Sequence, residues 1–236
     1  PDKLREAVEQ ALLRFPHMML TAEPTETAFR YRRNVQPAVV LPFDGVSTRY
    51  TIGSKDTNGY LFLVGYHDKT IYMEYQHSIS DGRGFEEFIR CVLFQYLKNC
   101  GFPVENDGSV RGMDTRWSPE ESANGYEQLA DREFSPDGIW KKPEAVHAPE
   151  VQWGADGSEV VTEVTFPFSQ LHDYAKSIGV SPLSVLAPLM MKAFDDKFGG
   201  TDKPVIAEIP VDLRPLLPTL TTRYFICFID LPYFPE

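Results

Sequence analysis

Residues 102–156 carry no sustained hydrophobic period, and this stretch divides the sequence into two parts that do show regular patterns. The stretch is rich in glycine, proline, serine and charged side chains. Loops of such length without secondary structure are uncommon inside one compact domain. We therefore interpret residues 1–101 as one lobe, residues 102–156 as a crossover with some short helix, and residues 157–236 as the beginning of a second, incomplete lobe.

The first part mixes helical and extended patterns. Apolar side chains at helical spacing predict a helix over residues 3–14, and an amphipathic stripe predicts another over residues 84–99. Aromatic and β-branched residues predict a hairpin of strands 61–67 and 70–77, joined at Asp68-Lys69. Two further extended segments are predicted over residues 28–35 and 38–42.

The second part repeats this mixture. Strands are predicted over residues 159–166, 204–210 and 224–231, and helices over 169–178 and 182–198. Ser181-Pro182 is a typical helix start, and Pro188 is expected to kink the helix or to remove one of its hydrogen bonds. Hairpins together with strand–helix–strand order predict an α/β (α+β) two-layer fold, with a mixed β-sheet flanked by helices.

Composition narrows the classes of function. The chain has 34 acidic and 23 basic side chains, and the basic ones are scattered, which argues against a nucleic-acid partner. No apolar run is long enough to predict a membrane span, and no secretory leader pattern is visible. Three widely spaced cysteines without a CxxC pair predict neither a zinc site nor a disulfide framework. These features favour a reducing, cytoplasmic setting.

One motif carries chemistry, the His-x-x-x-Asp-Gly of His77, Asp81 and Gly82 between a predicted strand and a predicted helix. His77 is placed at the strand end on a mostly apolar face, where an imidazole can stay neutral and act as a general base. Asp81 lies across the turn, where it can bind donors or a cation. Gly82 and Gly84 permit a tight turn into the helix. The same residues also suit a purely structural role, with Asp81 as a helix N-cap.

Other site classes find no support in the sequence. The remaining histidines lack partners at metal-ligand spacing, so we expect no metal site. Neither a Gly-x-Ser-x-Gly elbow nor a Walker or dinucleotide fingerprint is present.

Four segments resemble the chloramphenicol-acetyltransferase-like superfamily, which includes alcohol O-acetyltransferases, condensation domains of peptide synthetases and HxxxD acyltransferases. They are the LLRFP of residues 12–16, the loop 76–84, the IGVSP of residues 178–182 and the IPVDLRP of residues 209–215. The resemblance covers the N-terminal half to two-thirds of such proteins. It implies a chloramphenicol-acetyltransferase-like lobe followed by the start of a second, similar lobe.

The resemblance also implies roles for individual residues. His77 corresponds to the catalytic base, Asp81 to a structural aspartate that pairs with an arginine, Arg214 to that arginine, and Gly82 to the glycine that shapes the loop. The implied reaction is acyl transfer from acyl-coenzyme A, as co-substrate, to a small-molecule alcohol, without a permanently bound cofactor. Gln76 departs from the second histidine of condensation domains, and Asp212 stands where the family often has asparagine.

Two alternatives stay open. One is condensation-domain-like amide or ester formation from the thioester of an acyl or peptidyl carrier protein. The net charge of −11 argues mildly against it, because carrier proteins are usually acidic as well. The other is a non-catalytic binding module or an inactive fragment. An incomplete second lobe would expose apolar surface, so we also expect self-association.

Overall fold

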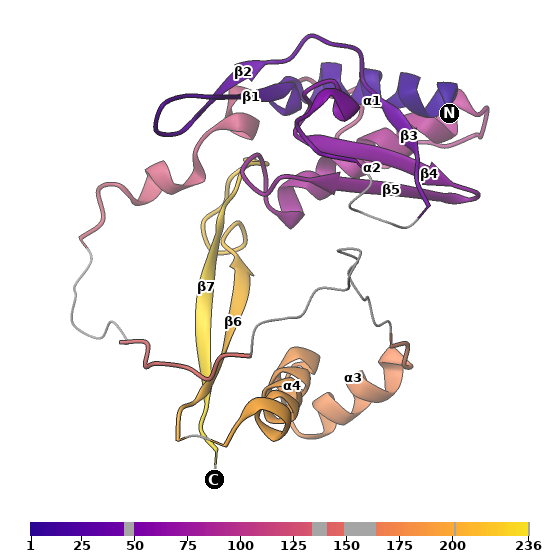
Figure 1. Cartoon of the computed structure of the whole chain (residues 1–236). Helices are drawn as coiled ribbons and strands as arrows, with labels where there is room; N and C mark the ends of the chain where they lie inside the picture. Colours follow the sequence, from indigo (N-terminus) through magenta and orange to yellow (C-terminus); the bar gives the residue numbers. More distant parts are fainter. Residues whose placement is uncertain (45–49, 134–140, 149–163, 201, 236) are drawn as a thin grey trace. The chain divides into compact units, whose positions relative to one another are not determined.

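The computed structural model describes residues 1–44, 50–133, 141–148, 164–200 and 202–235 (Figure 1). The chain divides into two compact units, which are described separately. Unit 1 comprises Pro1–Arg132 and Asp212–Ile226, and unit 2 comprises Glu133–Val211 and Cys227–Glu236. The segment 212–226 therefore belongs to the unit that contains the His77 loop. The three-part division expected from the sequence stays a prediction.

Unit 1 contains two long helices and five strands among its described residues. The helices are α1 (Asp2–Arg14) and α2 (Gly82–Asn99). The strands are β1 (Leu20–Pro24), β2 (Phe29–Arg33), β3 (Val40–Pro42), β4 (Phe62–His67) and β5 (Thr70–Tyr75). The crossover region adds two short 3₁₀ helices, Pro119–Ser122 and Gly125–Leu129, in agreement with the expectation of some short helix there.

The strands of unit 1 form two small sheets. Strands β1 and β2 pair antiparallel. In the second sheet β4 is central, with β3 parallel on one side and β5 antiparallel on the other. The β4–β5 hairpin closes between His67 and Thr70, and Asp68 adopts a positive φ of 48° in the turn. The predicted hairpin is thus confirmed, and its sheet is mixed.

Helices α1 and α2 pack against the β3–β4–β5 sheet and enclose the core of unit 1 (Figure 1). The ring of Phe88 lies 5.3 Å from that of Phe62 on the sheet and 5.8 Å from that of Phe15 after α1. All three rings are buried. Full burial of such side chains stabilises a fold by about 2–3 kcal/mol each. The apolar stripes read from the sequence therefore face the core.

A buried ion pair fastens the crossover region to α1. Arg14 donates to both carboxylate oxygens of Glu121, at 2.9 and 3.1 Å, and to the hydroxyl of Thr115 at 2.9 Å. The carboxylate of Glu121 also accepts from the backbone N–H of Ser118 as part of a capping box. A two-pronged contact of this kind fixes orientation as well as position.

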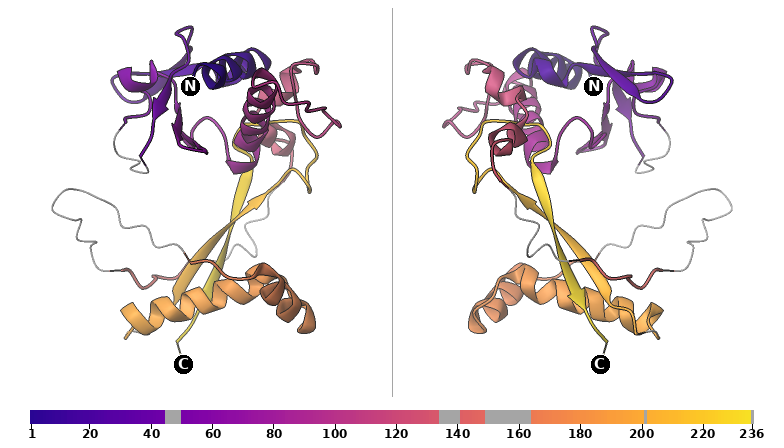
Figure 2. Two further views of the ribbon diagram at one scale, coloured as in Figure 1. Left: turned by 90° about the vertical axis from the view of Figure 1, so that its right-hand side faces the viewer. Right: turned by 90° about the vertical axis from the view of Figure 1, so that its left-hand side faces the viewer.

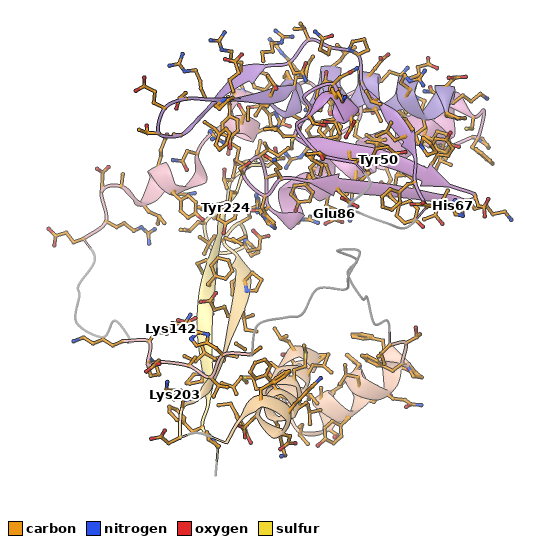
Figure 3. All side chains as sticks on the ribbon, viewed as in Figure 1. Tyr50, His67, Glu86, Lys142, Lys203 and Tyr224 are labelled. Carbon is orange, nitrogen blue, oxygen red and sulfur yellow. The ribbon has the colours of Figure 1, made fainter. Side chains whose placement is uncertain are left out.

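Unit 2 contains the helices α3 (Phe168–Ser177) and α4 (Pro182–Phe198). It also contains the strands β6 (Val205–Asp212) and β7 (Ile226–Tyr233), except for their residues Asp212 and Ile226, which are assigned to unit 1. Strands β6 and β7 form a two-stranded, strongly twisted ribbon (Figure 2). Lys142 lies beside this ribbon and pairs with Glu208 and Asp230 (Figure 3). Among the described residues of this unit, one buried apolar cluster consists of Ala187, Met191 and Val205.

The predicted fold class is confirmed: the chain is a mixed α/β protein with small sheets flanked by helices. The described strands form three separate sheets. Strand β1 was not predicted. Of the strand predicted over 159–166, residues 159–163 lie outside the described residues, and 164–166 form no strand. Helix α4 continues through Pro188. Among the described residues no single helix is long and apolar enough to cross a membrane, although α3 and α4 together, bent by 99°, reach the required length and composition.

Candidate active site

The candidate site is built on the loop between β5 and α2. Strand β5 ends at Tyr75, two residues earlier than predicted, so His77 lies in a turn and is exposed rather than held on a strand face. The loop is anchored at both ends. The N–H of Gln76 donates to Leu61 O at 2.9 Å, and Ile79 and Ser80 are buried behind the turn. The loop therefore presents His77 outward from a fixed base.

Asp81 begins α2 as its N-cap. Its side chain accepts a hydrogen bond from the N–H of Gly84 at 2.7 Å, which satisfies one of the free donors of the first helical turn. Asp81 is only 1% exposed, which is unusual for a carboxylate. The structural role expected from the sequence is thus present, but burial of the group requires further partners.

Those partners come from the segment 212–226. The second carboxylate oxygen of Asp81 accepts from Arg214 Nη1 at 3.0 Å and from the backbone N–H of Phe225 at 2.7 Å. Asp81 and Arg214, which the sequence places 133 residues apart, are therefore in direct contact. With three donors, one of them a guanidinium, the carboxylate is held as a charge-assisted acceptor.

Arg214 uses its other N–H groups to hold the same segment. Its Nε donates to Thr221 O at 2.8 Å, and its Nη2 donates to Arg223 O at 2.7 Å. A further bond of 2.8 Å joins Nη1 to Asp212. The planar fork thus binds two carboxylates and two backbone carbonyls at once, a set of contacts that a lysine cannot reproduce.

A close contact at the start of α2 also attaches the segment 212–226 to the His77 loop. Ser80 Oγ donates to Thr222 O at 2.5 Å. A Cβ atom on Gly84 would overlap this same carbonyl and would lie 2.6 Å from Ser80 Oγ. A Cβ on Gly82 would meet nothing nearer than the hydroxyl of Tyr75 at 3.9 Å. The steric need for glycine therefore falls on Gly84, whereas Gly82 occupies the first position of α2 without such a need.

Two tyrosines flank the imidazole of His77. The Tyr75 ring lies 5.4 Å from it, and the Tyr224 ring lies 5.9 Å from it at an interplanar angle of 75°. Tyr75 itself stacks on the buried ring of Phe85 at 4.0 Å. Burial, followed by the nearby charge of Asp81, raises the pKa of Tyr75. Tyr224 was not predicted as a site residue, because no local pattern marks it and its contact with His77 bridges 147 positions.

A cavity of about 300 Å³ lies next to Arg214 and is lined by Arg83, Gly84, Glu87, Arg111, Asp212, Arg214, Pro215, Thr219 and Thr221. Its three guanidiniums are all ion-paired: Arg83 with Glu86, Arg111 with Glu87, and Arg214 with Asp81 and Asp212. An anion entering this cavity would compete with these carboxylates. Within the described residues, no group of three or more His, Cys, Asp or Glu side chains could hold a metal ion.

Solved structures match this chain along its whole length. Polyketide synthase associated protein 5 from Mycobacterium tuberculosis matches with a TM-score of 0.63 and 15% identity, covering 99% of this chain and 59% of its own. A variant of the starter condensation domain of rhizomide synthetase RzmA, in complex with C8-CoA, matches with a TM-score of 0.51 and 15% identity, covering 100% and 58%.

A third match is TRI101 of F. sporotrichioides, complexed with coenzyme A and T-2, with a TM-score of 0.50 and 12% identity, covering 98% and 60%. No protein-family model and no curated protein sequence matches the chain. The chain therefore has the chloramphenicol-acetyltransferase-like fold of these proteins, and it spans less than two thirds of their length.

Proposed function

We propose that the protein is an acyltransferase in which His77 is the general base. The observation that carries the proposal is the construction of the His77 loop. An exposed imidazole stands on a turn whose last residue, Asp81, is buried and tied to Arg214 and to the N–H of Phe225. A rigid loop that presents one basic side chain to solvent suits proton transfer to or from a bound substrate.

In the proposed reaction, an acceptor hydroxyl attacks the carbonyl carbon of an acyl thioester while His77 takes the hydroxyl proton. The tetrahedral intermediate then collapses, the carbon–sulfur bond breaks, and the proton held by His77 passes to the leaving thiolate. The products are the acyl ester and the free thiol, and the imidazole returns to its neutral form. Asp81 takes no part in proton transfer, because its oxygens are occupied by Gly84, Arg214 and Phe225.

We propose acyl-coenzyme A as the donor and a small alcohol as the acceptor. Two proteins of the same fold were solved with coenzyme A species, namely C8-CoA and coenzyme A. The second candidate donor is the thioester of a carrier protein, because one of these proteins is a starter condensation domain. Both donors present a thioester at the end of a flexible arm, so the chemistry required of His77 is the same.

The test measures release of free thiol from acetyl-coenzyme A in the presence of a panel of alcohols and amines, using protein expressed from its whole native reading frame. Replacing a general base typically costs 10²–10⁴-fold in rate, so His77→Ala should lower kcat/KM by about that factor. His172→Ala is the matched control, since His172 is an exposed histidine of α3 that contacts Asp173 and Phe168.

Three outcomes separate the candidates. Full turnover by His77→Ala contradicts the role of His77. Turnover only with a phosphopantetheinylated carrier-protein thioester assigns the second donor. Absence of acyl transfer from both donors, with retained binding of either, supports a non-catalytic module.

A further inference from the structure

We propose that Tyr224 is a positioning residue for the His77 imidazole, and that the Asp81–Arg214 pair acts on the site through Tyr224. The inference rests on the proposed function for the role of His77. It adds Tyr224 to the site and states how Asp81 and Arg214 affect His77. Among the described residues, no side chain or backbone group forms a hydrogen bond with the His77 ring. A catalytic imidazole is ordinarily oriented by a hydrogen bond to its second nitrogen.

Ring contacts take the place of that hydrogen bond. Tyr224 meets His77 nearly perpendicular, at 75° and 5.9 Å between ring centres. The ring of Tyr75 lies 5.4 Å from the same imidazole, at an interplanar angle of 48°. Edge-to-face ring contacts at such distances are favourable. Two rings around an otherwise exposed side chain therefore limit the rotamers that the imidazole can occupy.

The backbone on both sides of Tyr224 is bound to one ion pair. Arg223 O accepts from Arg214 Nη2 at 2.7 Å, and the N–H of Phe225 donates to Asp81 at 2.7 Å. Arg214 and Asp81 in turn bind each other at 3.0 Å. The two peptide groups that flank residue 224 are thus held by Arg214 and by Asp81, which also caps α2, and this pair sets the position of the tyrosine.

The next side chain in the segment anchors the chain beside Tyr224. Phe225 is fully buried, and its ring lies 5.0 Å from that of Tyr126 and directly against Gly125. Phe225 is thus anchored in the core of unit 1, whereas Tyr224 is only half-buried and its ring meets that of His77. Figure 3 shows its side chain just before β7 begins.

This arrangement gives the buried aspartate a function beyond capping. The carboxylate of Asp81 binds Gly84, Arg214 and Phe225 and so orders the chain that carries Tyr224, which means that a change at Asp81 or Arg214 can reach His77 through that chain. Misplacement of a reacting group by about 1 Å can cost roughly 10²-fold in rate. Tyr224 acts through the geometry of His77, so its loss lowers kcat more than it changes KM.

The experiment compares Tyr224→Leu, Tyr224→Phe and Tyr174→Leu in the whole native protein. Tyr174, an exposed tyrosine of α3, is the matched control. The first readout is the ¹H–¹³C spectrum of the histidine Cε1–H groups, with the His77 signal assigned from its loss in His77→Gln. Tyr224→Leu should move this signal through loss of the ring current, and should lower kcat by about 10–100-fold with KM within about threefold. Tyr224→Phe and Tyr174→Leu should resemble the wild type in both readouts.

A double-mutant cycle tests whether Arg214 acts on His77 through Tyr224. Arg214→Lys keeps a positive charge near Asp81 but loses the fork that binds Thr221 O and Arg223 O. We expect it to move the His77 signal, and we expect Tyr224→Leu to cost less in the Arg214→Lys background than alone. Additive losses would overturn the path through Tyr224.

The two proposals fail separately. Full activity of His77→Ala removes the proposed function, while the His77 signal still reports the contact. An inactive His77→Ala combined with a Tyr224→Leu variant that is unchanged in spectrum and in kcat overturns only the present inference.

Discussion

Helices α2 and α4 begin by the same local rule but in different surroundings. In each, the N-cap side chain accepts from the N–H three residues later: Asp81 from Gly84 at 2.7 Å, and Ser181 from Ser184 at 3.1 Å. Ser181 is exposed, and its other contact is the hydroxyl of Ser184 at 2.8 Å. Asp81 is buried and bound to residues 133 and 144 positions away. A capping residue becomes the centre of a site when a distant segment supplies further donors to it.

The largest expected effect is on the free energy of unfolding, and it differs between the caps of α2 and α4. Asp81→Ala removes the cap, the acceptor of the Phe225 N–H and the partner of Arg214, whose side chain is 13% exposed. Removing one partner of a buried ion pair costs about 3–5 kcal/mol. Ser181→Ala removes a local cap only and should cost about 1 kcal/mol. Urea denaturation followed by circular dichroism measures both.

Hydrogen exchange locates the damage from these two substitutions. Asp81→Ala should deprotect the amides of segment 219–225, whereas Ser181→Ala should affect only the first turn of α4. Equal losses of stability in the two variants would show that the long-range donors add nothing to the cap of α2.

The third position of each helix provides the next contrast. Gly84 and Ser184 both donate to the cap, yet Gly84 is buried against the Thr222 carbonyl, whereas Ser184 is exposed. Alanine is favoured over glycine inside helices by about 1 kcal/mol. Gly84→Ala should nevertheless destabilise by about 3 kcal/mol, because its Cβ would overlap Thr222 O, a backbone atom that moves only with its segment. Ser184→Ala should stay within about 0.5 kcal/mol of the wild type.

Thermal unfolding measures the pair of variants, and the His77 signal shows whether the segment has moved. A Gly84→Ala protein that is more stable than the wild type would mean that segment 219–225 is free to withdraw from α2.

The sequence predicted the elements that local patterns encode. The stripes of α1 and α2, the β4–β5 hairpin and the cap at Ser181 depend on neighbours within a few positions, and all are present. Strand β1, with the sequence Leu20–Pro24, combines proline, glutamate and alanine and has no strand pattern of its own. It is a strand because it pairs with β2, from Phe29 to Arg33.

The site shows the same division between local and distant information. The motif around His77 is visible in the sequence, and the resemblance supplied Arg214 as a partner of Asp81. The contacts of Phe225, Thr222 and Tyr224 join segments more than 130 positions apart, and no periodicity encodes them. Gly84 illustrates the limit most clearly. Glycine is needed at this position because of the Thr222 carbonyl, which only folding brings to the start of α2.

The smallest expected effect is a pH dependence of stability. It concerns the segment attached to α2 and not the start of α4. His17 contacts the same segment, with Nε2 2.6 Å from Thr222 Oγ1, while that hydroxyl donates to Glu121 O at 3.0 Å. The neutral ring therefore donates to Thr222. Burial lowers the pKa of His17 to about 4; the nearby Glu121 raises it, and Arg14, Arg223 and Arg111 lower it further.

Stability falls with falling pH because the folded and unfolded chains bind the proton of His17 at different pH values. In the unfolded chain His17 takes up a proton near pH 6.5, whereas the folded protein resists protonation until about pH 4. The stabilisation is complete above pH 6.5 and is lost as the pH falls to 4, by about 2–3 kcal/mol. Urea denaturation at pH 7, 6, 5 and 4 should show a smaller loss for His17→Gln than for the wild type, and an unchanged loss for His172→Gln. Identical slopes for wild type and His17→Gln would mean that the imidazole becomes charged without disturbing Thr222, so that the attachment of this segment to α2 depends on Asp81 and Arg214 alone.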